Sequence, residues 1–257
     1  MKNPASPMLP TASPAAPPDS TPDRRAGPPP TSRVADEIEA VAWIHGEVRA
    51  GRLLPLLEVG TVVDSLFVEL SWGAGVPDSL AAPGSMDTYN AMHAVNVSLL
   101  AMALARNVQF DDAATRKIGL AALLHDIGML RIDPDILARP GQLTALEREQ
   151  VKRHPEEGVR IVLAADASLD LAAVVAYEHH IKIDGSGYPR PLFRRSAHYV
   201  TRLVQVCDIY HALRSPRPFR PPWPDEIIES FLTERAGFEF HPALCASLVG
   251  LMRRSAG

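Results

Sequence analysis

Several of the nine histidines stand where a helix is expected to end or next to a carboxylate. His125 and Asp126 close the apolar run KIGLAALLHD, just before Gly128, which can end a helix by adopting a left-handed backbone. His154 comes directly before Pro155, a favoured first-turn residue, so its ring is expected to project from a helix N-terminus. Imidazole and carboxylate groups that leave helix ends together are suited to binding metal ions.

Four more groups extend this pattern. His179 and His180 are consecutive at the end of LAAVVAYEHH, and adjacent residues on a helix point about 100° apart, so each can face a different ion. His93 and Asp208 lie on apolar helix faces and are predicted to point inward, where an isolated carboxylate is costly. Any one histidine taken alone is more simply a packed or surface residue, and only the joint spacing favours a site.

These seven groups, five imidazoles and two carboxylates, suit two octahedral metal ions that share a bridging carboxylate. Nitrogen and oxygen ligands without a thiolate favour iron or manganese over a structural zinc. Because a chain of 257 residues can bury roughly 70% of its unfolded surface, it needs no metal to hold its fold. A bound metal is therefore expected to be functional.

The elements that must position these groups are predicted to be helices. Helix spacing begins at Val34, and strand alternation is not sustained anywhere, so the predicted fold class is all-α, a helical bundle. Loops with Gly and Pro separate the helices, among them DGSGYP at 184–189. Helices are expected at about 86–106, 114–127, 144–153, 156–165, 169–180, 197–213, 224–235 and 241–253.

The N-terminal segment has a different composition. Ten prolines fall within residues 1–30 among Ala, Ser and Thr, without apolar periodicity. We predict that residues 1–32 form a disordered, Pro-rich tail, because such a composition buries too little surface to offset its ordering entropy. The remaining residues, 33–257, are predicted to form the functional domain, with 33–85 as helices that pack on its core.

Composition excludes several classes of protein. The balance of 30 carboxylates against 26 Lys and Arg excludes a general nucleic-acid binder. The chain shows neither a secretory signal nor an apolar window of about 20 residues, so a cytoplasmic protein without a membrane span is expected. Cys207 and Cys245 lie in apolar surroundings and are predicted to be packing residues in a reducing compartment.

The motifs, taken together, closely resemble the HD-GYP subgroup of the HD phosphohydrolase superfamily. The resemblance covers about residues 58–253 and rests on DTYNAMHAVNVSLLA, HDIGMLRIDPDILARPGQLT, KRHPEEG, EHHIKIDGSGYP, DIYHALRSPRPFR and GFEFHPAL. It implies a helical domain with a binuclear iron or manganese centre. It also implies hydrolysis of the bacterial second messenger cyclic di-GMP to pGpG or GMP by a hydroxide that bridges the two metals.

The resemblance also assigns the ligands, with Asp126 as the catalytic bridge between two ions that hold the hydroxide between them. One ion would be held by His93, His125, Asp126 and Asp208, and the other by Asp126, His154, His179 and His180. Some relatives carry a carboxylate one helical turn before the first histidine and take a third ion. This chain has Tyr89 there, so two ions are expected.

Substrate recognition is expected from the DGSGYP loop, which begins at Asp184, and from the segment after Asp208. Gly187 allows the backbone to approach a ligand, and Tyr188 offers a ring face to a guanine or a hydroxyl to a phosphate. Arg217 and Arg220 match family positions that contact phosphate, although either alone would more often be a solvated surface charge.

Three positions depart from the family pattern. Met129 stands where a lysine is expected beside the scissile phosphate, Ile181 replaces a glutamate, and His211 replaces an aspartate. The leading interpretation is a cyclic di-GMP phosphodiesterase, because all seven ligands are kept. Met129 and Ile181 favour a catalytically weak relative that binds cyclic di-GMP, or a diguanylate-cyclase (GGDEF-type) partner, as an effector. The GYP loop and the two arginines argue against a third reading, a phosphohydrolase for another nucleotide.

Overall fold

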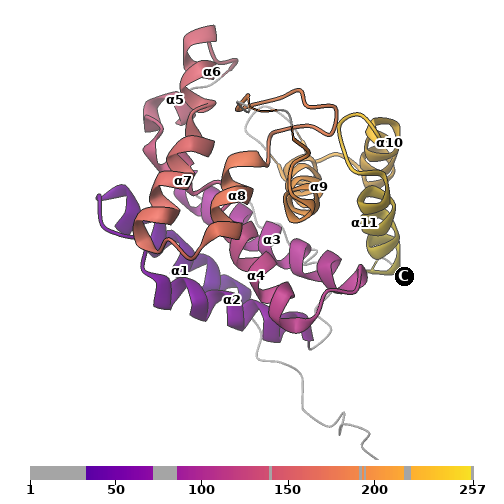
Figure 1. Cartoon of the computed structure of the whole chain (residues 1–257), viewed down its shortest axis with the longest axis horizontal. Coiled ribbons are helices and arrows are strands. Elements are labelled where there is room, and N and C mark those ends of the chain that lie inside the picture. The colour runs from indigo at the N-terminus through magenta and orange to yellow at the C-terminus, as the bar shows by residue number, and fades with distance from the viewer. Residues whose placement is uncertain are drawn as a thin grey trace, which may run out of the picture. The chain divides into compact units, whose positions relative to one another are not determined.

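The computed structural model describes residues 33–71, 86–138, 141–190, 193, 195–216 and 221–255. The predicted tail, residues 1–32, lies outside the described residues, as do Arg217 and Arg220. The described ranges form the helices α1 (Arg33–Arg49), α2 (Leu56–Ser71), α3 (Met86–Asn107), α4 (Asp112–Leu123), η1 (Ile127–Arg131, 3₁₀), α5 (Pro134–Ala138), α6 (Ala145–Val151), α7 (His154–Ala165), α8 (Asp170–Glu178), α9 (Tyr199–Arg214), α10 (Asp225–Arg235) and α11 (Pro242–Ser255) (Figure 1).

The all-α prediction is confirmed. Within the described ranges no strand forms, and β-type pairing is limited to two isolated bridges, Ile181 with Gly187 and Ala236 with Phe240. Local sequence explains several helix starts. Thr144 and Glu147 form a reciprocal capping box at α6, and the Asp111 carboxylate accepts a hydrogen bond of 2.7 Å from the Ala114 N–H at α4.

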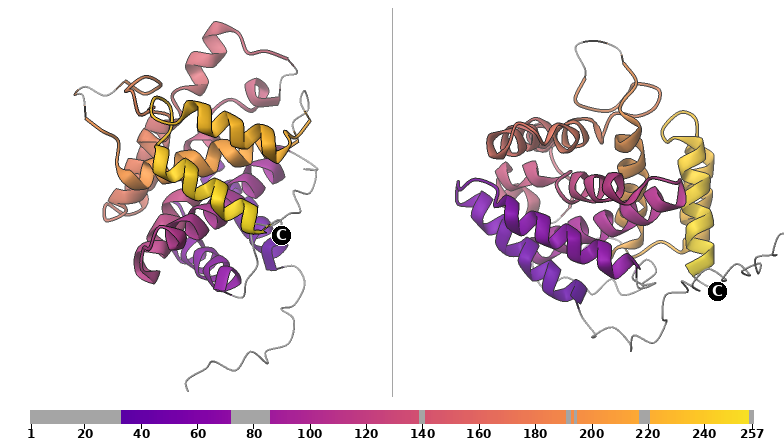
Figure 2. Two further views of the ribbon diagram at one scale, coloured as in Figure 1. Left: turned by 90° about the vertical axis from the view of Figure 1, so that its right-hand side faces the viewer. Right: turned by 60° about the horizontal axis from the view of Figure 1, so that its bottom comes forward.

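The central element of the bundle is α3. Every residue from 91 to 102 is buried, as expected for a helix that is surrounded by others. It packs against α1, α4 and α9, while α2 packs on α1 and α4, and α7 packs on α8 and η1. The last two helices, α10 and α11, pack on each other and on α9 (Figures 1 and 2). This packing brings the helices that carry histidines together.

The helix predicted at 114–127 ends earlier than expected. It stops at Leu123, and the chain turns through His125 and Asp126 into η1. The left-handed backbone expected at Gly128 is also wrong, since its φ is not positive. A Cβ on Gly128 would lie 1.9 Å from the His154 carbonyl oxygen, so glycine is required because η1 packs directly on the first turn of α7.

Two further observations concern the cysteines and the apolar character of the helices. Cys207 and Cys245 are free and buried in the apolar core, which confirms their packing role. In the part of the chain that the structure describes, no helix combines the length and the apolar character required to cross a bilayer.

Candidate metal centre

The structure brings all seven predicted ligands together in two groups. Candidate ligand atoms lie within 4.8 Å of one another in each group. The groups are Asp126, His154, His179 and His180, and His93, His125 and Asp208. This division is the one expected for two ions.

Asp126 lies between the two groups and directs one carboxylate oxygen toward each. Its Oδ1 is 3.2 Å from His154 Nε2 and 3.3 Å from His179 Nε2. Its Oδ2 is 3.5 Å from His125 Nε2 and 4.0 Å from His93 Nε2. A carboxylate in this position can bridge two ions.

The ligands come from five parts of the bundle, one of which is the turn between α4 and η1 that carries His125 and Asp126. His93 lies within α3, His154 is the first residue of α7, and Asp208 lies in the second half of α9. His179 caps the C-terminus of α8 and His180 follows it. The projection of His154 from a helix N-terminus is as predicted, with Pro155 in the first turn.

Backbone carbonyls orient three of the histidines. The Nδ1 atoms of His125, His154 and His179 lie 2.7, 2.7 and 3.0 Å from the carbonyl oxygen three residues earlier in the chain. A carbonyl oxygen can only accept a hydrogen bond, so each Nδ1 carries the proton and each Nε2 presents a lone pair. Metal-ligating histidines are usually oriented by such a bond on the other ring nitrogen.

The free lone pairs then point at one another. His154 Nε2 and His179 Nε2 are 3.2 Å apart, an arrangement that is repulsive unless a positive charge lies beside them. His125 Nε2 is buried and has no hydrogen-bond partner among the described residues. A divalent ion in each group would satisfy these atoms, so the donor set fits a metal centre.

The protonation states also favour ligation. Burial raises the pKa of Asp126, but the adjacent His125 and the contacts with His154 and His179 together outweigh it and hold that pKa well below its usual value. Burial also raises the pKa of Asp208, but the contact with His93 and the nearby His125 together outweigh it and lower that pKa. Burial lowers the pKa of His125 and, more strongly, that of His180. For His179, burial is outweighed by the hydrogen-bond contact and charge of Asp126, which raise the pKa. Ionised Asp126 and Asp208 and neutral His125 and His180 are the forms that bind a divalent ion.

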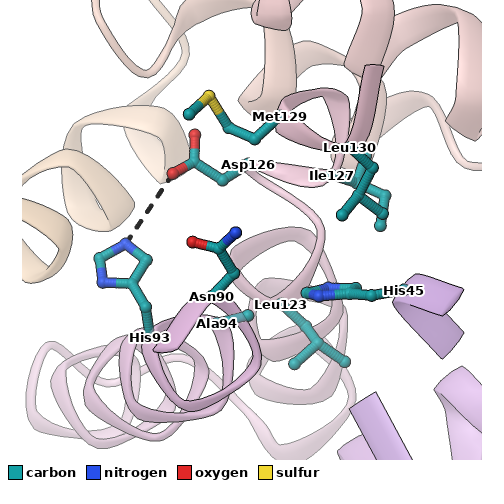
Figure 3. Close-up of a pocket in the computed structure, with 9 residues that line it drawn as sticks. All are labelled: His45, Asn90, His93, Ala94, Leu123, Asp126, Ile127, Met129 and Leu130. Carbon is teal, nitrogen blue, oxygen red and sulfur yellow. Dashed lines mark ion pairs between the residues drawn. The ribbon is translucent and has the colours of Figure 1, made fainter. Parts of the chain in front are cut away.

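A small pocket, called the cavity below, adjoins the centre (Figure 3). Asp126 and His93 open onto it, together with Met129, and the described residues that line it include no lysine or arginine. Asn90, on the same face of α3 as His93, and His45 of α1 also line it, and the sequence patterns assigned no role to either. Asn90 could have been found from its spacing of one turn before His93, whereas only packing brings α1 to this cavity.

The GYP loop packs against the ligand group that contains His154 and His180. The ring of Tyr188 lies 4.5 Å from the ring of His180, centroid to centroid, and burial raises the pKa of its hydroxyl. Gly187 has a φ of 95°, and a Cβ there would lie 2.0 Å from the His180 carbonyl oxygen. Asp184 is exposed, and its carboxylate accepts a hydrogen bond of 2.8 Å from the Ser186 N–H, so it shapes the turn.

The late GFEFHPAL segment supports this loop. The Asp184 N–H donates to the Phe238 carbonyl oxygen at 3.1 Å, and the Ile183 N–H donates to that of Glu239 at 3.2 Å. The Lys182 ammonium lies 3.1 Å from the Glu239 carboxylate. These bonds explain why a segment so late in the chain belongs to the same motif set.

The remaining departures from the family pattern are buried. Ile181 is 4% exposed, and its carbonyl oxygen accepts hydrogen bonds from the side chains of Arg202 and Gln205. His211 is also buried and meets His93, Nδ1 to Nδ1, at 2.8 Å. Tyr89 stacks on His93 with ring centroids 6.3 Å apart and offers no carboxylate.

In this helical bundle a histidine–aspartate turn meets five further His and Asp side chains that can ligate metal. This arrangement defines the class of helical HD-type domains. The family described as HD domain matches residues 80–236, and with its GYP loop the chain belongs to this family, in the HD-GYP subgroup. It is 35% identical over 184 residues to the cyclic di-GMP phosphodiesterase PA4108 of Pseudomonas aeruginosa, covering 72% of this chain and 44% of that protein.

Two other similarities are informative. The chain is 34% identical over 158 residues to the 3'3'-cGAMP-specific phosphodiesterase 2 of Vibrio cholerae, covering 61% of this chain and 30% of that protein. The solved structure of Bd1817, a HDG"Y"P protein from Bdellovibrio bacteriovorus, shares the fold with a TM-score of 0.63 and 16% identity, over 86% of this chain and 70% of that one. The chain thus spans less than half the length of these two curated relatives.

Proposed function

We propose that this chain is a metal-dependent phosphodiesterase that hydrolyses cyclic di-GMP to pGpG or GMP. The observation that carries the proposal is Asp126, which directs one carboxylate oxygen to each of two ligand groups at 3.2–4.0 Å from their histidine nitrogens. Two divalent ions, with iron or manganese best suited to the donors, would be held by the ligand sets that share Asp126. Such a pair, when bound, supplies activated water and neutralises phosphate charge.

The protein's own residues would bind and orient the dinucleotide. Tyr188 offers a ring face beside His180, and Gly187 leaves the backbone open to close approach. We assign phosphate recognition to Arg217 and Arg220, whose guanidinium groups suit phosphate oxygens. The buried His154 and His179, tied to backbone carbonyls, hold their Nε2 atoms toward the reacting centre without further reorganisation.

The choice of substrate rests on the curated relatives, which are named for two cyclic dinucleotides. Cyclic di-GMP is favoured because the relative that aligns with the larger share of this chain carries that name. We also propose that the protein works in the cytoplasm, because free Cys207 and Cys245 suit a reducing compartment.

A second candidate function has one observation in its favour. Met129 lines the cavity beside Asp126, where the family places a lysine, so the cavity lacks that positive charge. An effector would tolerate this loss. Such a protein would be weakly active and would act by binding cyclic di-GMP or a GGDEF-type partner.

One experiment separates these functions. The protein would be purified anaerobically with Fe²⁺ or Mn²⁺ supplied, and metal content would be measured together with turnover of cyclic di-GMP and of 3'3'-cGAMP. Two ions per chain with faster turnover of cyclic di-GMP support the proposal. Two ions with tight binding and no turnover support the effector, and faster turnover of 3'3'-cGAMP overturns the choice of substrate.

A further inference from the structure

His93 differs from the other metal-facing histidines in how its ring is held. His125, His154 and His179 lie at helix ends, where backbone carbonyls are free to accept from Nδ1. His93 lies in the interior of α3, where the carbonyls are used by the helix itself. Its Nδ1 therefore needs a side-chain partner from another helix.

His211 of α9 is that partner. It is 2% exposed, and its Nδ1 lies 2.8 Å from His93 Nδ1. The hydroxyl oxygen of Ser215, which is fully buried, lies 3.2 Å from His211 Nε2 and 3.5 Å from His211 Nδ1. His211 thus lies between His93 and a buried hydroxyl.

Ligation by His93 would fix the protons of the His93–His211 pair. His93 Nε2 is the ring nitrogen on the side of Asp208, 3.2 Å from Oδ1, so to ligate an ion shared with Asp208 it presents its lone pair there and keeps its proton on Nδ1. That proton is donated to His211 Nδ1, which must be an acceptor. His211 then carries its own proton on Nε2, the nitrogen nearer to the Ser215 hydroxyl.

We propose that His211 is a positioning residue for the first metal position, the one formed by His93, His125 and Asp208. It accepts from His93 Nδ1, selects the tautomer with the lone pair on Nε2, and holds the ring toward the ion. This inference rests on the proposed two-metal function. It also gives a role to His211 in place of the family's aspartate. A neutral imidazole polarises His93 less than a carboxylate would, so the first ion is held more weakly than it would be with aspartate.

The test is Mn²⁺ binding by the full chain, followed by metal analysis and by the electron paramagnetic resonance signal of a coupled Mn²⁺ pair. His211→Leu removes the acceptor, whereas His211→Asn keeps an acceptor oxygen near the position of Nδ1. His241→Leu is the matched control, because His241 lies outside both ligand groups.

We expect His211→Leu to weaken binding of one ion by about 10- to 100-fold and to abolish the coupled signal, while the second ion is kept. His211→Asn and His241→Leu should retain both ions, and His211→Asp should bind the first ion more tightly than the native protein. Full Mn²⁺ occupancy with native affinity in His211→Leu overturns the proposal, as does equal loss in the Leu and Asn variants.

Two features of the experiment keep its result interpretable. If His211→Leu does not fold, the Asp and Asn variants still decide, because Asp must hold the first ion more tightly than Asn does. The readout is binding and does not depend on hydrolysis. A native protein that binds two Mn²⁺ ions without cleaving cyclic di-GMP would contradict the proposed phosphodiesterase and leave the inference on His211 intact.

Discussion

Met129→Lys would place a positive charge in the cavity beside the proposed metal centre. The Met129 side chain lines this cavity together with Asp126 and His93 (Figure 3). Lysine has a similar length and similar helix propensity, so η1 can accept it without a change of backbone. Because Met129 belongs to neither ligand group, metal content should not change.

The expected gain follows from the charge alone. A hydrogen bond from an ammonium to a phosphate oxygen is worth about 2–3 kcal/mol where it forms in the transition state. At about 1.36 kcal/mol for each factor of ten, this corresponds to roughly a 30- to 150-fold increase in kcat/KM for cyclic di-GMP. Among the residues that the structure describes, the cavity lining offers no lysine or arginine that would reduce this difference.

The assay is steady-state hydrolysis of cyclic di-GMP by anaerobically loaded protein, with metal content measured on the same samples. Met129→Gln is the matched control, since it adds polarity at similar length without charge, and should gain little. Turnover that stays undetectable in Met129→Lys with both ions bound would refute the reasoning and favour the effector. A native protein that is already as fast as the lysine variant would show that another cation performs this role.

Four further expectations can be measured directly. Asp126→Ala should lose most of the metal, because both ligand groups use that carboxylate; retention of two ions by metal analysis contradicts the bridge. Changing Arg217 and Arg220 together to Ala should weaken cyclic di-GMP binding by about tenfold or more per residue without loss of metal; unchanged affinity in a calorimetric titration would show that both are solvated surface charges without a role in phosphate binding. Gly128→Ala should cost about 2–3 kcal/mol in the free energy of unfolding, because its Cβ would meet a backbone carbonyl oxygen at 1.9 Å; an unchanged melting temperature would be inconsistent with this contact. A chain starting near Ser32 should keep the melting temperature and turnover of the full chain, and a substantial loss of either would count against a dispensable tail.

Helices with strong apolar periodicity were predictable within a few residues. The predicted ranges 86–106 and 197–213 correspond to α3 and α9, because a buried helix shows its period over many turns. The short elements η1 and α5 were not predicted, since five residues are too few to show a period. The end of α4 was placed wrongly for a related reason: the apolar run continues past Leu123, while the backbone turns there to bring Asp126 into the centre.

The types and order of the seven ligand residues follow from the sequence by itself, because the donor chemistry of His and Asp does not depend on context and helix spacing shows which way they face. Only the tertiary structure decided that each oxygen of Asp126 faces a different group, and that His93 meets His211 across 118 positions of chain. Such contacts depend on how the side-chain ridges of α3 and α9 fit together, which no local pattern encodes. The close approach of η1 to α7 at Gly128 has the same origin: a glycine is visible in any sequence, but the neighbour that requires it appears only when the helices are packed.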